Sequence, residues 1–212
     1  MKYNRISLNN YGFISAKFSE SDLTPIKTEI NNIQNNFELY ESQKRNYTLA
    51  GNIKREYALV ESQKYIEKLL MPLVGAYNKD FEYMKNFTML TSNVPIILDS
   101  CWVNFQQKYE FNPVHNHSGL YSFVIWTNIP YDMEEERKLS PGAESVHDTA
   151  GMFSFLYSDA TGTIRTYDIP VDKSMENSIV VFPAKFNHFV YPFFSSDGYR
   201  ISVSGNFKFN TG

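Results

Sequence analysis

The spacing of hydrophobic residues changes near residue 95 of the 212-residue chain. Before that point, apolar side chains recur every three or four positions, which is typical of one face of an α-helix. After it, short apolar runs alternate with polar residues and are separated by turns, which indicates β-strands. We therefore expect one domain with a largely helical support over residues 1–94 and a β-rich core over residues 95–212.

Two helices are predicted in the first part. The first is expected to be capped by Asp22 or Thr24, whose side-chain oxygens can accept from the backbone N–H groups of the first turn, with Pro25 tolerated nearby. Its apolar face consists of Ile26, Ile30, Ile33 and Phe37. The second helix extends from about residue 62 to 81, and Pro72 is expected to kink or divide it because proline lacks the N–H that an inner turn needs.

Seven strands are predicted after residue 95, separated by turn-forming segments rich in Pro, Gly, Asn, Asp and Ser. They are Ile96–Gln106, Leu120–Ile129, Met152–Tyr157, Thr163–Pro170, Ser178–Phe182, His188–Pro192 and Arg200–Phe209. Many short strands with few helices are typical of an antiparallel sandwich or jelly roll. Residues 132–149 read as a loop long enough to be a lid or an insertion. We predict a mainly β fold, a double-stranded β-helix (jelly roll, cupin-like) with helices packed outside it.

Composition and charge narrow the class of protein. The formal net charge is −3 and both signs are mixed along the chain, so no basic surface for nucleic acid is expected. The single cysteine, Cys101, excludes an internal disulfide and a cysteine-based zinc site, and we expect it in the core. No signal peptide and no apolar run of about 18 residues is evident, so we expect a cytoplasmic protein without a membrane partner. Oligomeric state leaves no mark on the sequence.

Three of the four histidines lie where they can converge. His115 and His117 are two positions apart in an extended segment, so their side chains point to the same face. His188 follows the turn FPAKFN, where a late strand can bring it beside the pair. Arg200 comes twelve positions later, and Ser202 shares its strand face. A His-x-His pair alone is a weak signal, but the combination predicts a metal site.

This combination suits one kind of chemistry. Iron(II) in oxygenases is held on one face by three protein ligands, which leaves positions for a cosubstrate and for oxygen. A 2-oxo acid can take two of those positions, and its distal carboxylate then needs a fixed cation. Arginine suits that role because its planar fork binds a carboxylate through two hydrogen bonds. We therefore predict iron(II) and 2-oxoglutarate as cofactor and cosubstrate, with Arg200 as the anchor and the Ser202 hydroxyl as a further donor.

The segments CWVNFQ, NPVHNHSGLYSFVIWTNIP and IVVFPAKFNHFVYPF, followed by YRISVSGNF, resemble Fe(II)/2-oxoglutarate-dependent dioxygenases. In particular they resemble the small prolyl-4-hydroxylase-like branch found in marine bacteria and their phages, over roughly residues 100–210. The resemblance implies a double-stranded β-helix and a hydroxylase that converts 2-oxoglutarate to succinate and carbon dioxide while it oxidises a substrate. Peptidyl proline is the substrate of some members and small molecules of others.

Position by position, the resemblance implies His115, His117 and His188 as metal ligands. It implies a cosubstrate pocket made of Arg200, Ser202, Trp102, Asn104, Tyr121 and Asn206. The family's second ligand is usually a carboxylate, and this chain has His117 there. The alternative is that His117 is the first ligand and Gly119 stands in the carboxylate position, which would leave a coordination position open.

Two other functions stay open at the level of sequence. One is a cupin-type metalloenzyme that uses three histidines without 2-oxoglutarate. The other is a non-catalytic jelly-roll module with a binding or structural role. A peptide, a free amino acid and a lipid are not distinguished as substrates.

Overall fold

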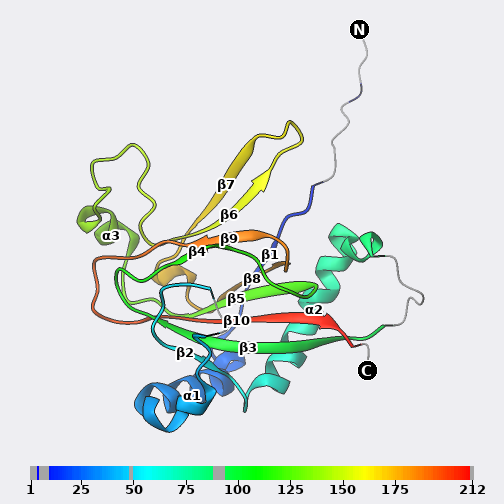
Figure 1. The fold of residues 1–212 in the computed structure, drawn as a ribbon, viewed down its shortest axis with the longest axis horizontal. Helices are drawn as coiled ribbons and strands as arrows, with labels where there is room; N and C mark the ends of the chain where they lie inside the picture. The colour runs from blue at the N-terminus through cyan, green and yellow to red at the C-terminus, as the bar shows by residue number, and fades with distance from the viewer. Residues whose placement is uncertain (1–3, 5–9, 48–49, 88–93, 211–212) are drawn as a thin grey trace.

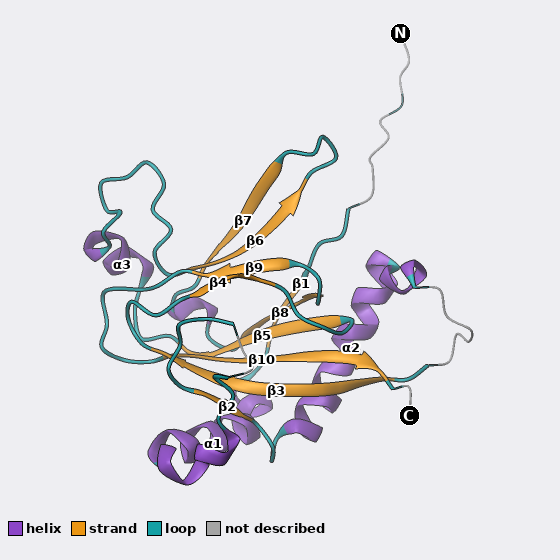
Figure 2. Ribbon diagram, in the orientation of Figure 1, coloured by secondary structure: helices purple, strands orange, loops and turns teal. Residues whose placement is uncertain are grey.

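Two antiparallel sheets face each other across the core (Figures 1 and 2). The computed structural model describes residues 4, 10–47, 50–87 and 94–210. The larger sheet has the order β1-β8-β5-β10-β3-β2 and the smaller one the order β4-β9-β6-β7, with all pairs antiparallel. This arrangement confirms the predicted jelly roll.

The bounds of the strands are as follows. The larger sheet contains β1 (Ile14–Lys17), β2 (Glu56–Ala58), β3 (Ile96–Gln106), β5 (Tyr121–Asn128), β8 (Ser178–Pro183) and β10 (Arg200–Phe209). The smaller sheet contains β4 (Asn112–His115), β6 (Met152–Ser158), β7 (Ile164–Pro170) and β9 (Asn187–Val190). Strands β3 and β10 have the predicted bounds, and the other five predicted strands differ from the observed ones by one or two residues at an end. Strands β1, β2 and β4 were not predicted.

Two long helices cover the outer side of the larger sheet, opposite the smaller sheet (Figure 1). They are α1 (Glu20–Asn35) and α2 (Gln63–Phe81), and short 3-10 helices follow them at Phe37–Gln43 and Tyr83–Asn86. Alternate residues of the central strands pack against these helices, because successive side chains of a strand point to opposite faces. On this side lie Cys101, Val103, Phe105, Tyr121, Phe123, Ile125, Ile201 and Val203. Burial raises the pKa of the Cys101 thiol to about 12, which makes this residue an inert part of the core.

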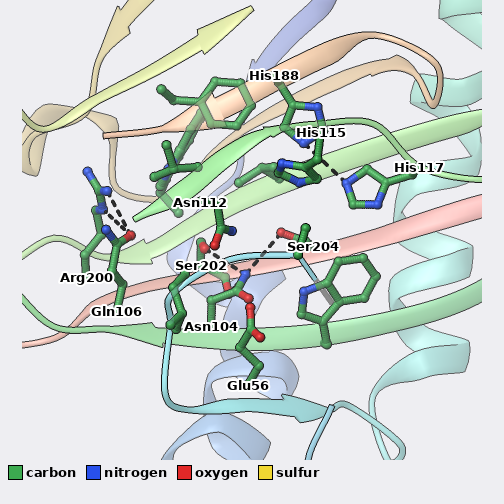
Figure 3. A pocket seen from close by; sticks show the side chains of 17 residues that line it. Glu56, Asn104, Gln106, Asn112, His115, His117, His188, Arg200, Ser202 and Ser204 are labelled. Carbon is green, nitrogen blue, oxygen red and sulfur yellow. Dashed lines mark hydrogen bonds between the residues drawn. The ribbon is translucent and has the colours of Figure 1, made fainter. Parts of the chain in front are cut away.

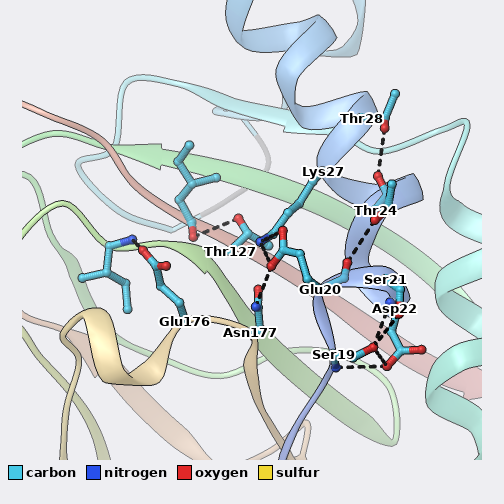
Figure 4. Close-up of polar contacts among 12 residues, drawn as sticks. Ser19, Glu20, Ser21, Asp22, Thr24, Lys27, Thr28, Thr127, Glu176 and Asn177 are labelled. Carbon is cyan, nitrogen blue, oxygen red and sulfur yellow. Dashed lines mark hydrogen bonds and ion pairs between the residues drawn. The ribbon is translucent and has the colours of Figure 1, made fainter.

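The start of α1 differs from its prediction. Ser19 is the N-cap, and Asp22 is the third helical residue, whose side chain accepts from the backbone N–H of Ser19 at 3.0 Å. The two residues form a capping box, in which each side chain satisfies the other's backbone N–H, so the expected cap at Asp22 or Thr24 is wrong. Glu20 then accepts from Lys27 within the helix and from Asn177, in the loop before β8 (Figure 4). These contacts fasten the helix to the sheet.

Two further expectations are corrected. Helix α2 continues through Pro72 and is not divided there. Residues 132–149, expected to be a loop, begin with the helix α3 (Met133–Leu139). The buried Glu136 of α3 accepts from the backbone N–H groups of Phe194 and Ser195, at 2.6 and 2.9 Å. This segment is therefore tied to the connection between β9 and β10. No helix in the described residues is long and apolar enough to cross a membrane.

Glu29 joins the two long helices. This buried residue of α1 accepts four hydrogen bonds, from the N–H groups of Val60, Glu61 and Ser62 and from the Ser62 hydroxyl, at 2.5 to 3.0 Å. These groups precede the first turn of α2, where backbone donors lack partners within the helix. A buried carboxylate is tolerated here because all of its bonds come from fixed donors.

Replacement of Glu29 by Ala should lower the free energy of unfolding by about 3 kcal/mol, because the four donors would be left buried without an acceptor. Glu29→Gln should cost less, because an amide keeps one acceptor oxygen. Chemical denaturation followed by circular dichroism measures both. Glu61→Ala, which removes an exposed carboxylate from the same segment, is the control and should change little. Equal losses in Glu29→Ala and Glu61→Ala would contradict this role of Glu29.

Candidate active site

His115, His117 and His188 come together at one end of a cavity between the two sheets (Figure 3). One ligand atom from each of them lies within 4.8 Å of the others. The ring centroids are 4.3 to 5.0 Å apart, and the Nε2 atoms of His117 and His188 are separated by 3.3 Å. Three imidazoles at these distances could hold a single metal ion.

Strand pairing produces this cluster. His115 ends β4 and His188 lies in β9, and the two are direct partners in the antiparallel register. His117 is two positions beyond, where its backbone N–H donates to the Ala184 carbonyl at 2.8 Å. The His188 ring is stacked on Phe153, with centroids 5.6 Å apart, and meets Phe182 edge-on. The backbone positions of all three histidines and the ring of His188 are thus fixed by the fold.

In two of the rings, a backbone carbonyl contacts Nδ1 and so leaves Nε2 available as a ligand atom. Nδ1 of His115 is 2.7 Å from the Pro113 carbonyl oxygen, and Nδ1 of His188 is 3.0 Å from that of Phe186. A carbonyl can only accept, so Nδ1 carries the proton in each ring and Nε2 keeps its lone pair. A metal-bound histidine is typically oriented by this kind of contact at its other nitrogen.

Burial also keeps the three rings neutral. It lowers the pKa of His117 to about 4 and that of His188 to about 3, and it lowers the pKa of His115 as well. The nearby imidazoles add to the effect at His117 and His188. Near pH 7 all three are therefore neutral imidazoles, which is the form that a metal requires. The donor set fits iron(II), for which imidazole is a normal ligand.

Arg200 lies at the opposite end of the same cavity, only 3% exposed (Figure 3). Its guanidinium donates to Gln106 Oε1 twice, at 3.1 and 2.8 Å, and to the Tyr131 hydroxyl at 2.7 Å. It also donates to the carbonyl oxygens of Gly151 and Tyr191, at 3.1 and 2.7 Å. These contacts compensate the burial of the charge and fix its position.

A polar wall connects the two ends of the cavity. Asn104 Nδ2 lies 3.2 Å from the Ser202 hydroxyl oxygen and 3.3 Å from that of Ser204. Asn104 Oδ1 is buried and, within the described residues, has no hydrogen-bond partner. Glu56 is the cross-strand neighbour of Asn104, and its carboxyl lies beside the Asn104 carboxamide in Figure 3. Burial raises the pKa of Glu56 to about 8, and the negative charge of Glu110 adds to this. Glu56 is therefore mostly protonated at neutral pH.

The structure brings most, but not all, of the predicted site residues to this cavity. Trp102, Asn104, His115, His117, His188, Arg200 and Ser202 line it. Tyr121 does not, because its odd-numbered position in β5 points to the helices, where it contacts Tyr77 and Tyr83. The expected pocket role of Tyr121 is corrected accordingly. Asn206 accepts from Ser122 at 2.6 Å and lines a neighbouring hollow instead.

That second hollow is more open to the surface than the inner cavity. Trp102, His115 and His117 border both spaces. The histidine cluster is therefore accessible from two directions. The inner one leads to Arg200, and the outer one leads to the surface beside Asn206.

Gly119 has a structural reason to be glycine. Its φ is +102°, and a Cβ atom there would lie 2.6 Å from the Phe207 carbonyl oxygen. A side chain is excluded by the backbone at this turn, whatever the ligand set of the site. This weakens the alternative in which Gly119 marks an open coordination position.

Four polar residues of the site were not predicted. Ser204 follows Arg200 and Ser202 on the same face of β10, so it could have been found from the sequence. Gln106 follows Trp102 and Asn104 on the same face of β3, so the alternation of the strand could have revealed it. Tyr131 and Glu56 gave no such signal. They lie outside the predicted strands, and only the folded chain places them beside Arg200 and Asn104.

The fold and the site define the class: a jelly roll whose cavity combines a cluster of three imidazoles, able to hold a metal ion, with the buried guanidinium of Arg200. The family model described as "Putative 2OG-Fe(II) oxygenase" matches residues 100–206, half of the chain. The chain belongs to this family and is a 2-oxoglutarate-dependent oxygenase that uses iron(II). No curated protein matches the sequence.

Solved structures share the fold at low sequence identity. A prolyl-4-hydroxylase from Pseudomonas putida is 14% identical with a TM-score of 0.58, and the match covers 93% of this chain and 92% of that one. A viral collagen prolyl hydroxylase from Paramecium bursaria Chlorella virus-1, in complex with 2-oxoglutarate, is 10% identical with a TM-score of 0.51, covering 92% and 94%. An oxidoreductase of the 2OG-Fe(II) oxygenase family from Burkholderia pseudomallei is 14% identical with a TM-score of 0.51, covering 93% and 84%.

Replacement of His188 by Ala should weaken metal binding by at least about 100-fold, because one of three ligands is lost. Anaerobic titration with iron(II), or titration with manganese(II), followed by calorimetry measures the affinity, and one ion per chain is expected for the wild type. His147→Ala is the matched control, because this histidine is exposed and lies outside the cluster. Equal metal binding in wild type and His188→Ala would contradict the three-histidine site.

Replacement of Glu56 by Gln should stabilise the metal-free protein at pH 9 and leave it nearly unchanged at pH 4. A buried acid with a raised pKa contributes stability that is complete below its unfolded value near 4.5 and is lost as pH rises through about 8. The upper limit of this loss is about 5 kcal/mol. Thermal unfolding across this pH range measures it. The exposed Glu38→Gln is the control, and a gain of equal size at pH 4 and pH 9 would contradict the assignment.

Proposed function

We propose that His115, His117 and His188 hold the iron(II) ion of this oxygenase, and that Arg200 and Ser202 bind 2-oxoglutarate. The observation that carries this proposal is the shared cavity, which has three neutral imidazoles at one end and a buried, fixed guanidinium at the other. 2-Oxoglutarate has groups for both ends: a 2-oxo acid that can chelate a metal ion and a second carboxylate that can pair with a guanidinium. A cupin-type metalloenzyme without 2-oxoglutarate would have no use for that cation.

When bound, iron(II) and 2-oxoglutarate would supply the chemistry for oxygen activation: one oxygen molecule would provide one atom to succinate, formed with carbon dioxide from 2-oxoglutarate, and one atom to the C–OH group made from a substrate C–H bond. The protein's part is to bind, orient and shield. His115 and His188 present Nε2 because their Nδ1 protons are engaged by backbone carbonyls. Val124, Trp126 and Phe153 give the cavity apolar walls, which limit the access of water.

The polar wall is suited to the body of the cosubstrate. Ser202 and Ser204 present hydroxyl groups to the cavity, and their oxygens are held by Asn104. The Asn104 Oδ1, which has no partner within the described residues, can accept a hydrogen bond from a protonated Glu56 or from a bound ligand. Since Glu56 is largely neutral near pH 7, it adds little repulsion toward an incoming dianion.

We propose that the substrate enters through the outer hollow beside Trp102 and Asn206, because the inner cavity is taken by the cosubstrate. A peptidyl proline is our proposed substrate, since two of the similar structures are named as prolyl hydroxylases. We further propose that residues 1–94 support the catalytic core through α1 and α2, and that the enzyme acts in the cytoplasm.

Arg200→Lys should raise the dissociation constant of 2-oxoglutarate by about 100-fold, because an ammonium cannot reproduce the two-pronged contact with a carboxylate. Succinate release with iron(II) should fall correspondingly at low 2-oxoglutarate concentration. Metal binding should stay unchanged, because Arg200 is at the far end of the cavity.

The control is Lys208→Ala on the same strand, whose side chain pairs with Asp99 at the surface. If wild-type protein with iron(II) forms no succinate and binds no 2-oxoglutarate, the proposed function is wrong. Metal binding without 2-oxoglutarate binding would favour the cupin-type alternative. The absence of both would favour the non-catalytic module.

A further inference from the structure

The guanidinium of Arg200 is fully hydrogen-bonded before any ligand is present. Arginine has five N–H donors, and each of them has an acceptor here. A distal carboxylate can therefore bind only if one of these acceptors moves away. The identity of that acceptor determines how strongly the cosubstrate is held.

Gln106 is the acceptor placed to move. Of the four residues in the described part of the chain that accept from Arg200, only Gln106 also lines the cavity. Gly151 and Tyr191 contribute backbone carbonyls, and this backbone is held in place because the N–H groups of the two residues donate to the Pro192 and Met152 carbonyls. The Gln106 side chain has several rotatable bonds and faces the space that a ligand would enter.

The Gln106 side chain contacts the same edge of Arg200 that a carboxylate would bind. Its Oε1 accepts from both Nε and Nη2 of Arg200, which is the edge of the guanidinium fork that binds carboxylates. The register of the sheet makes this contact, because Gln106 and Arg200 are direct partners on β3 and β10. The Gln106 Nε2 donates to the Glu110 carbonyl at 2.6 Å and holds the carboxamide in this orientation.

We propose that the Gln106 carboxamide takes the place of the distal carboxylate on Arg200, and that 2-oxoglutarate binds by displacing its oxygen. This proposal rests on the proposed function. Gln106 thereby sets the affinity for the cosubstrate and favours a 2-oxo acid that carries a second carboxylate. A charged carboxylate competes successfully with a neutral amide oxygen, whereas an apolar chain end does not.

Two substitutions at Gln106 should act in opposite directions. Gln106→Met keeps the length of the side chain and removes the acceptor, so 2-oxoglutarate should bind about tenfold more tightly. Gln106→Glu places a carboxylate of the same shape on Arg200, so binding should weaken by about 100-fold. A residue that merely supported Arg200 would give weaker binding in Gln106→Met.

The experiment is calorimetric titration of protein with iron(II) under anaerobic conditions, so that no turnover occurs. Each variant is titrated with 2-oxoglutarate and with 2-oxopentanoate, which has a methyl group in place of the distal carboxylate. The Gln106 substitutions should shift the affinity for 2-oxoglutarate and leave that for 2-oxopentanoate unchanged within about twofold. Gln107→Met, next to it and outside the cavity, is the matched control.

Thermal unfolding without ligand checks the fold of each variant. If Gln106→Met does not fold, Gln106→Glu still tests the proposal, because this variant keeps the size of the side chain and an acceptor for Arg200. Weaker 2-oxoglutarate binding in Gln106→Met, unchanged binding in Gln106→Glu, or equal shifts for both 2-oxo acids would overturn the proposal. A wild-type protein that binds neither acid would instead refute the proposed function, and this inference with it.

Discussion

The alternation of side chains across the larger sheet is the constraint on which the rest of the structure depends. In β3 and β10, one set of residues packs against α1 and α2, and the residues between them face the cavity. The antiparallel register then places Asn104 opposite Ser202 and Gln106 opposite Arg200. A shift of one residue in either strand would bury the polar set against the helices and expose the apolar set to the cavity.

Buried polar groups are costly, and this chain offsets the cost by supplying fixed partners. Glu29 and Glu136 accept from successive backbone N–H groups, and each joins two segments distant in sequence. Arg200 is satisfied in the same way by side-chain and backbone acceptors. Among the described residues, the exceptions include two groups at the cavity: Asn104 Oδ1, which has no partner, and Glu56, whose pKa is raised so that its neutral form is favoured. Such exceptions are expected where a ligand completes the set.

The third imidazole gives the proposed site an unusual electrostatic balance. A carboxylate ligand would neutralise part of the charge of iron(II), and His117 does not. The cavity would then be more positive, with Arg200 at its other end, and would favour a dianionic cosubstrate. The Gln106 carboxamide and a protonated Glu56 are neutral groups that line the same cavity, so neither of them adds a negative charge there.

The sequence by itself was enough to predict the jelly roll and the bounds of β3 and β10. It was also enough to single out His115, His117, His188 and Arg200, which line one cavity. These follow from local causes, namely the two-residue period of strands and the spacing of histidines along them. The Ser19-x-x-Asp22 capping box of α1 is a local pattern that the prediction missed. The helix in residues 132–149 and the direction of Tyr121 were misjudged because tertiary contacts decide the first and the start of the alternation in β5 decides the second. Only the tertiary structure placed Glu56 and Tyr131, since cross-strand register and loop closure bring together residues that are far apart in the chain.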